Sequence, residues 1–397
     1  MPVPKPTDIC LSIRSVRFNV PDSDPKSWAA ARGIIKKVSP TRIEWSYVRD
    51  RDKIDFMKDR ANVFVSSLNT ISPPGHALDF DAQPCIAPWM RKFGSPGDRK
   101  PYICMNNPTD LENRCRRSEE LISDGVTDTF QFDDWYGNAQ MFGWPRTPYT
   151  PTACFCSHCM REFGRYLGLD INYREYLVGR GIRSRKQLFA MAEQGEVPLW
   201  DDFKRFAEQS VYDYLRRLRQ TMARHLGEEP TLSVNATVNF DRIDLIKGLV
   251  DYLHGETRNF SPQNLYRMAA LSREKNLPQV VSMFPDVPAR EYHSDEFVAR
   301  IRRAIAVCYA LEMVPLFPWD VYAGDQPRWY GRWEEYRDPY QKVRESPHWL
   351  KDYRWTRLEQ KEGKVIIFAE LTDNSPIGIK HIIEEDGTWE IEEVMSD

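Results

Sequence analysis

The stretch Thr129-Phe-Gln-Phe-Asp-Asp-Trp-Tyr-Gly137 combines the pattern of a buried strand with two adjacent carboxylates at its end. Aromatic and polar residues alternate over 129–132, which predicts a β-strand. Asp133, Asp134 and Trp135 follow where this strand should end. A parallel strand that ends in acids and an aromatic residue is a common way to build a sugar-cleaving site.

The rest of the chain predicts a barrel around this strand. Seven more strand-like segments alternate with helical patterns, which favours a parallel (β/α)₈ (TIM) barrel. A doubly wound open sheet is the alternative, but no glycine-rich phosphate turn follows any of the strands. The predicted strands cover residues 9–19, 42–48, 62–69, 129–133, 231–236, 252–256, 279–284 and 313–320.

We expect two domains. Residues 1–345 should form the barrel, with a zinc-binding loop and a helical insertion at about 138–199. Residues 346–397 should form a short C-terminal β-rich extension. Its predicted elements are a strand at 364–369 and a hairpin over 379–394.

Composition excludes several classes of partner. The chain has 397 residues, a net charge of −3 and 28% charged residues, which gives no electrostatic footprint for nucleic acid or an anionic membrane. No apolar run approaches the roughly 20 residues needed to span a bilayer. The first residues lack the apolar core of a secretion signal, which favours a cytoplasmic location. The alternative is a secreted or periplasmic protein whose signal has been removed.

Five carboxylates at predicted strand ends are the catalytic candidates. In a barrel these ends meet at one mouth, and glycosidic cleavage needs a protonated and an ionised carboxyl that face each other. We take Asp134 as nucleophile or base and Glu256 as acid, with Asp133, Asp286 and Asp320 as alternates. Each of them could instead cap a helix or pair with an arginine.

Aromatic and polar residues near the same strand ends are candidates for substrate binding. Trp135, Trp319 and Tyr322 are the expected stacking platforms for sugar rings. His254 is expected to contact a hydroxyl group, although it could equally be a packed histidine. Asn235, at the end of the fifth strand, is a further expected substrate contact.

A cysteine cluster is the most specific local motif. Three thiols within six residues can surround one tetrahedral Zn²⁺, which favours thiolate ligands and needs one more. Cys104 and Cys115 are candidates for that ligand, and His158 is less favoured. Free cysteines or disulfides are the alternative, but disulfides are disfavoured in the cytosol. A closed zinc site would hold the loop rather than do chemistry. The cluster comprises Cys154, Cys156 and Cys159.

Over residues 60–335 the sequence resembles glycoside hydrolase family 42, the zinc-bearing β-galactosidases of clan A. The resemblance implies a barrel and makes Cys104 the fourth zinc ligand. Trimers occur in that family, so it also implies a homo-oligomer. The matching pieces are Ser66-Ser-Leu-Asn-Thr-Ile-Ser-Pro-Pro74, Cys104-Met-Asn-Asn-Pro108, Cys154-Phe-Cys-Ser-His-Cys159 with the helix after it, Asp202-Phe-Lys-Arg-Phe206 and Val234-Asn-Ala-Thr-Val-Asn239.

The chain departs from this family at both catalytic glutamates. Trp135 stands where the family's acid/base glutamate closes an Asp-Asn-Glu triplet on the fourth strand. On the seventh strand, Met283-Phe-Pro-Asp286 contains no counterpart of the nucleophilic glutamate. Retaining β-galactosidase activity is therefore not carried over.

The sequence predicts a glycoside hydrolase that acts on an oligo- or polysaccharide, with a specificity different from ordinary β-galactosidase. Its expected partner is a carbohydrate substrate, and its expected cofactor is a structural zinc ion. One alternative is a catalytically silent barrel that binds glycans. Another is a polysaccharide lyase, in which a tyrosine or histidine base works beside a group that neutralises a carboxylate.

Overall fold

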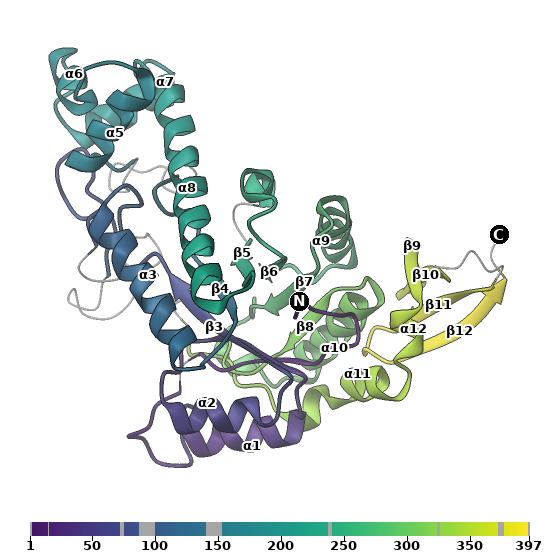
Figure 1. Ribbon diagram of the computed structural model, residues 1–397. Coiled ribbons are helices and arrows are strands. Elements are labelled where there is room, and N and C mark those ends of the chain that lie inside the picture. Colours follow the sequence, from purple (N-terminus) through teal and green to yellow (C-terminus); the bar gives the residue numbers. More distant parts are fainter. Residues whose placement is uncertain are drawn as a thin grey trace.

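The computed structural model describes residues 2–14, 16–71, 75–86, 100–139, 153–236, 240–323, 326–371 and 377–395. Eight parallel strands form a closed barrel, and four antiparallel strands form a separate sheet near the C-terminus (Figure 1). The fold class predicted from the sequence is therefore confirmed. Residues 72–74 and 237–239 of the family resemblance, and 140–152 of the expected insertion, lie outside the described residues.

The barrel strands pair in the order in which they occur in the chain. Each pairs in parallel with the next, and β1 also pairs with β8 to close the barrel. Carboxyl ends therefore gather at one mouth. The strands are β1 (Cys10–Ser12), β2 (Arg42–Ser46), β3 (Val63–Asn69), β4 (Thr129–Asp133), β5 (Thr231–Asn235), β6 (Tyr252–Thr257), β7 (Gln279–Met283) and β8 (Val314–Phe317).

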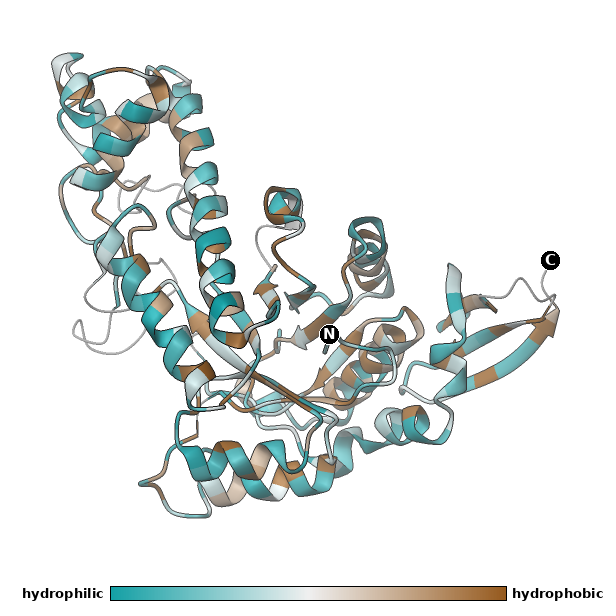
Figure 2. Cartoon of the chain, viewed as in Figure 1, coloured by the Kyte–Doolittle hydropathy of each residue, from teal (hydrophilic) through white to brown (hydrophobic). Residues whose placement is uncertain are grey.

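Helices surround the barrel and turn apolar faces towards it (Figure 2). Side-chain caps begin several of them, such as Ser27 at α1 and Ser294 at α10. In the described part of the chain, none is long and apolar enough to cross a membrane. The surrounding elements are α1 (Trp28–Val38), α2 (Arg51–Lys58), α3 (Pro108–Ser123), α8 (Trp200–Leu226), η3 (Phe240–Ile246), α9 (Pro262–Lys275), η4 (Ala289–Glu291), α10 (Asp295–Ala310) and α11 (Trp333–Glu345).

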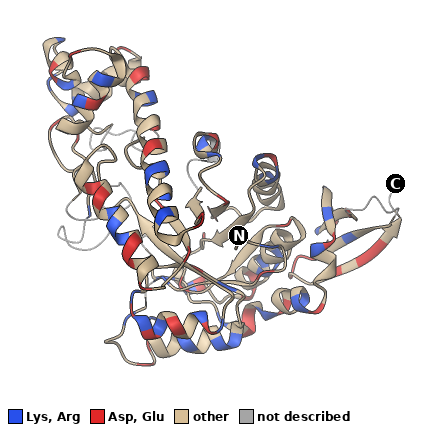
Figure 3. Cartoon of the chain, viewed as in Figure 1, with Lys and Arg blue, Asp and Glu red and all other residues tan. Residues whose placement is uncertain are grey.

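The helical insertion lies at the N-terminal end of α8 (Figure 1). It contains α5 (Ser157–Leu167), α6 (Tyr173–Gly179) and α7 (Arg185–Gln194). A second hydrophobic cluster, rich in aromatic rings such as Phe163 and Phe203, holds these helices against α8. Charges of both signs alternate along α3 and α8 (Figure 3), as expected of helices with a solvated face.

The barrel interior carries polar layers below the mouth. Arg42 and Glu44 form a fully buried ion pair of 2.7 Å, and the Tyr252 hydroxyl donates to Glu44 at 2.9 Å. Alternate residues of a strand face the same side. Tyr252, His254 and Glu256 of β6 therefore rise from this layer towards the mouth, so that only Glu256 is partly exposed.

The C-terminal sheet has the order β12-β11-β10-β9 and follows the short helix α12 (His348–Lys351). The strand and hairpin predicted here are present, but β9 was not predicted. Six of the nine residues of β9 are exposed and four are charged, so its sequence lacks a sustained apolar alternation. The strands are β9 (Tyr353–Lys361), β10 (Lys364–Leu371), β11 (Ile377–Ile383) and β12 (Trp389–Met395).

Candidate active site at the barrel mouth

Three neighbouring strands bring two carboxylates and an amide together. Asp133, Asn235 and Glu256 lie at the carboxyl ends of β4, β5 and β6. The Asn235 side-chain nitrogen donates to Asp133 Oδ1 at 3.0 Å and to Glu256 Oε2 at 3.2 Å. These two oxygens are thus at most about 6.2 Å apart, the sum of the two distances.

Asp133 accepts hydrogen bonds from three different donors. In addition to Asn235, the Tyr47 hydroxyl donates to Oδ2 at 2.8 Å and the Asp134 amide donates to Oδ1 at 3.1 Å. Burial and the neighbouring Asp133 charge raise the pKa of Tyr47, so the phenol stays neutral and remains a donor. These three donors fix the position of the Asp133 carboxylate at the mouth.

Asp134 has the opposite environment. Its backbone has a φ of 51°, in the left-handed region, and its carbonyl accepts a 2.6 Å hydrogen bond from Thr70 Oγ1. The side chain is half-buried. Burial and the negative charges of Asp133 and Glu256 raise the pKa of the Asp134 carboxyl well above its ordinary value. Asp134 is therefore the carboxyl of this group that retains a proton most readily.

Arg14, just beyond β1, supplies the positive charge of the mouth. Its Nη1 lies 3.7 Å from Glu256 Oε1, and its Nη2 donates to Ser282 Oγ at 3.1 Å. The guanidinium carbon lies 3.5 Å from the centre of the Trp45 ring. Burial lowers the pKa of Arg14 to about 10, which still leaves it charged at neutral pH. Glu256 thus has a positively charged neighbour held in place by Trp45 and Ser282.

The two remaining carboxylate candidates do not join this group. Asp320 is buried, and its oxygens accept from the Arg14 amide at 2.7 Å and from Arg328 Nε at 2.6 Å. It fixes the backbone of Arg14 rather than facing the mouth as a free acid. Asp286 is exposed and pairs with Arg300 of α10 at 2.5 Å. An arginine partner was the alternative considered for both residues.

The expected sugar-binding residues are mostly packed inside the protein. Trp135 is fully buried, and its Nε1 donates to the Asn235 carbonyl at 2.7 Å, so its ring supports Asn235 and offers no face to a sugar. His254 is also fully buried against Trp45, with ring centres 4.5 Å apart. Burial, then the charges of Arg14 and Arg42, lowers the pKa of His254 well below its ordinary value.

Trp319 and Tyr322 differ from each other in exposure. Trp319 is only 5% exposed, whereas Tyr322 is half-buried beside Phe284. Tyr322 is therefore the stacking candidate with the more accessible ring. Asn235, expected to contact substrate, is occupied instead in joining Asp133 and Glu256.

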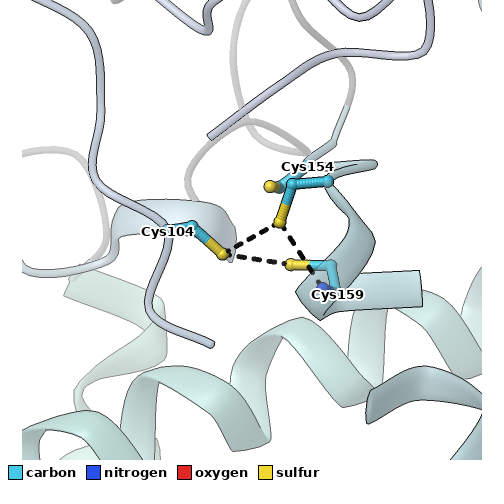
Figure 4. A group of neighbouring side chains, drawn as sticks. Cys104, Cys154 and Cys159 are labelled. Carbon is cyan, nitrogen blue, oxygen red and sulfur yellow. Dashed lines mark hydrogen bonds between the residues drawn. The ribbon is translucent and has the colours of Figure 1, made fainter. Parts of the chain in front are cut away.

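Four buried cysteines gather at one point, and Figure 4 labels three of them, Cys104, Cys154 and Cys159. The sulfur atoms of Cys104, Cys154, Cys156 and Cys159 all lie within 4.8 Å of one another, and all four residues are buried. Sulfur atoms around tetrahedral zinc are about 3.8 Å apart, given Zn–S bonds of about 2.3 Å. The set therefore fits one metal ion with four thiolate ligands.

Amide donors around these sulfur atoms also suit a metal centre. Asn106 Nδ2 donates to Cys159 Sγ at 3.4 Å, and Asn138 Nδ2 lies 3.6 Å from the same atom. Donors of this kind stabilise thiolate ligands. Cys115 and His158, the other candidates for the fourth ligand, are not part of the cluster, and His158 instead contacts Arg161 at the surface.

The sequence prediction missed Arg14 and Tyr47. Each follows the end of a strand, β1 and β2 respectively, which is the same positional signal that identified the acids. The predicted strands at 9–19 and 42–48 were too long and contained both residues, whereas β1 ends at Ser12 and β2 at Ser46. Arg14 and Tyr47 were therefore not placed at the mouth.

Comparisons with known proteins give the fold but no family. No protein-family model and no curated protein matches the chain. A GH36 α-galactosidase from Geobacillus stearothermophilus in complex with stachyose is similar, with a TM-score of 0.51, 8% identity and 94% of this chain covered. The match covers 47% of that chain, so this protein spans about half its length.

A maltogenic α-amylase from Thermotoga neapolitana is similar at a TM-score of 0.50 and 9% identity, over 99% of this chain and 94% of that one. Both neighbours are glycoside hydrolases. At such low identities the likeness shows the fold alone. Membership of family 42 is not shown by these comparisons, which show only that the chain shares a barrel fold with these two enzymes.

Proposed function

We propose that this protein is a glycoside hydrolase acting on an oligo- or polysaccharide at the mouth of the barrel. The observation that supports it best is the cluster of Asp133, Asp134 and Glu256. Its environments favour a proton on one carboxyl and negative charge on another. Glycosidic cleavage requires this division between an acid and an ionised partner.

We assign Asp134 as the general acid and Glu256 as the nucleophile or base, which exchanges the roles expected from the sequence. The raised pKa of Asp134 keeps its proton available for the leaving oxygen. Glu256 comes from β6, two strands away from Asp134, and has Arg14 as its countercharge. Asp133 orients Asn235 and maintains the negative charge that holds the proton on Asp134.

Asp134 and Glu256 together supply the proton and the nucleophile or base that the reaction needs. Asp134 gives its proton to the glycosidic oxygen as the bond to the anomeric carbon breaks. Glu256 either attacks that carbon directly, forming an ester that water then hydrolyses with the ionised Asp134 as base, or takes a proton from the water that attacks the carbon. The anomeric configuration of the first product, followed by nuclear magnetic resonance, distinguishes direct attack from attack by water.

The assignment is tested with two variants and two kinds of substrate. On a panel of natural oligosaccharides, Asp134→Asn and Glu256→Gln should each lower kcat by at least about 100-fold. On 2,4-dinitrophenyl glycosides, whose leaving group needs no proton, Asp134→Asn should recover most of its activity and Glu256→Gln should not. Asp201→Asn, in the exposed pair with Lys204 on α8, is the control and should match the wild type. Full activity of both variants would exclude this pair.

The alternatives predict different results. A catalytically silent barrel would bind saccharides across a broad panel without turnover by the wild type. A lyase would give an unsaturated product that absorbs in the ultraviolet. The raised pKa of Tyr47 weighs against a tyrosine base in such a reaction.

We further propose that the four cysteines hold one structural zinc ion. With four protein ligands the site would have no open position, so it would stabilise the loops rather than take part in catalysis. Elemental analysis should find about one zinc per chain in the wild type and much less in Cys156→Ser. Equal metal content in the two proteins would contradict the assignment.

A further inference from the structure

Beside the mouth, a surface cavity of about 470 Å³ lies between the loop after β6, the loop after β7 and α10. We call it the rim cavity. Three arginines line it, namely Arg258, Arg300 and Arg303. Asp286 is the one carboxylate among the described lining residues. The cavity therefore has an excess of positive charge, and its volume falls in the range of small-ligand sites.

Aromatic rings and neighbouring groups hold two of these guanidinium groups. The guanidinium carbon of Arg258 lies 5.9 Å from the centre of the Phe284 ring, and that of Arg300 lies 5.6 Å from Phe260. Arg300 also pairs with Asp286. Contacts of this kind restrict the arginines and reduce the entropy lost when they bind a ligand.

The known contacts of two of the arginines each use one nitrogen of the guanidinium group. Arg300 Nη2 pairs with Asp286, and Arg303 Nη2 donates to the Gly363 carbonyl. A guanidinium group has five N–H donors, so these contacts leave donors that an anionic acceptor in the cavity can use.

The N-terminus of α9 adds to the positive potential. Ser261, its N-cap, and Pro262, its first residue, both line the cavity. The first turn of this 14-residue helix contains no acidic side chain that would offset the positive end of the helix dipole.

The rim cavity is adjacent to the proposed catalytic group. Arg258 follows Glu256 by two residues in the chain. Phe284, against which Arg258 packs, also contacts Tyr322, with ring centres 6.1 Å apart. A saccharide that passes over Tyr322 would thus bring a neighbouring sugar unit towards Arg258.

We propose that the rim cavity binds an acidic substituent, a carboxylate or sulfate group, of the saccharide substrate. Planar guanidinium groups suit these anions because two N–H donors can engage two oxygens at once. This proposal rests on the proposed function and narrows the substrate class to acidic glycans.

The test is calorimetric titration of the full chain with three tetrasaccharides: galacturonate, sulfated galactose and neutral galactose. At least one acidic probe should bind about tenfold or more tightly than the neutral one, and added NaCl should weaken that binding. Arg258→Ala and Arg300→Ala should each lower the acidic-probe affinity about tenfold. The acidic probe that binds with the higher affinity identifies the preferred substituent.

Arg180→Ala is the matched control, because Arg180 is also an exposed arginine packed on an aromatic ring, Tyr176, but is far from the cavity. It should bind like the wild type. Equal affinity for acidic and neutral probes, no binding of either acidic probe, or wild-type affinity in both cavity variants would overturn the proposal. Because binding is measured without turnover, acidic-probe binding by a chain that hydrolyses no glycoside would refute the enzyme assignment and leave the anion site standing.

Discussion

At the scale of single residues, the three acids of the mouth have different environments. Asp133 has three hydrogen-bond donors, Glu256 has the Arg14 guanidinium, and Asp134 Oδ1 accepts a long 3.5 Å hydrogen bond from the Tyr102 hydroxyl. The burial of Asp134 and its two negative neighbours make its neutral form the favoured one. The same carboxylate chemistry thus gives different roles through environment alone.

The charge of Asp133 should control the pH range of activity. Asp133→Asn removes one of the negative charges that raise the pKa of Asp134, so that pKa should fall. An acid must be protonated to work, so the alkaline limb of the kcat/KM profile should move to lower pH. Asp286→Asn should leave that limb in place. An unmoved limb in Asp133→Asn would show that Asp134 is not the acid.

Asp134 should also lower the free energy of unfolding at neutral pH. In the unfolded chain its carboxyl ionises near pH 3.9, whereas in the folded chain it keeps its proton to higher pH. Its contribution to the free energy of unfolding is therefore lost as pH rises from about 4 through the folded pKa. Asp134→Asn should raise Tm by roughly 2 °C or more at pH 7, and by less at pH 4. A lower Tm at pH 7 would contradict this account.

At the scale of elements, strand ends were predictable because the alternation of strands and helices fixes where carboxyl ends meet. That rule placed Asp133, Asp134 and Glu256 at strand ends. It could not predict the arginine partners of Asp286 and Asp320, because these partners lie 14 and 8 residues further along the chain. Trp135 was misjudged because its burial depends on how the turn after β4 packs against β5.

The turn after β4 links the acids to the cysteine cluster. Gly137 has a φ of 39°, and a Cβ at this position would lie 2.2 Å from Met105 Cε, beside Cys104. Asn138 then reaches the cluster itself. The loop that carries Cys104 and the turn that carries Asp134 therefore hold each other in place.

Gly137→Ala should disturb this contact without unfolding the barrel. The left-handed backbone lowers the free energy of unfolding of the alanine variant by about 1–2 kcal/mol. The clash of the added Cβ with Met105 adds to this cost and displaces the turn. We expect a large loss of kcat with far-ultraviolet circular dichroism unchanged. Gly195→Ala is the control, since Gly195 also has a positive φ but nothing within 4 Å of the added Cβ. If both variants lose the same stability and keep full activity, the turn does not depend on Met105.

At the scale of the whole molecule, the barrel and the C-terminal sheet share one hydrophobic core. Val365, Ile367 and Trp389 of the sheet belong to the same buried cluster as the barrel residues. The Trp389 ring stacks on Tyr309 of α10 with ring centres 6.4 Å apart. Arg303 of α10 also donates to the Gly363 carbonyl. The sheet therefore packs against the outer helices of the barrel as part of the same core and is not an independent unit.

Trp389→Ala should consequently destabilise the whole chain. Truncating a buried tryptophan costs about 3–5 kcal/mol, and the cavity would open at the junction of the sheet with α10. Unfolding by urea, followed by circular dichroism and by activity, should show one shared transition at a lower midpoint, because the core is common to both parts. Trp349→Ala, outside that shared core, serves as the comparison and should shift the midpoint less. Two separate transitions, with activity retained after the first, would show instead that the sheet folds and unfolds independently of the barrel.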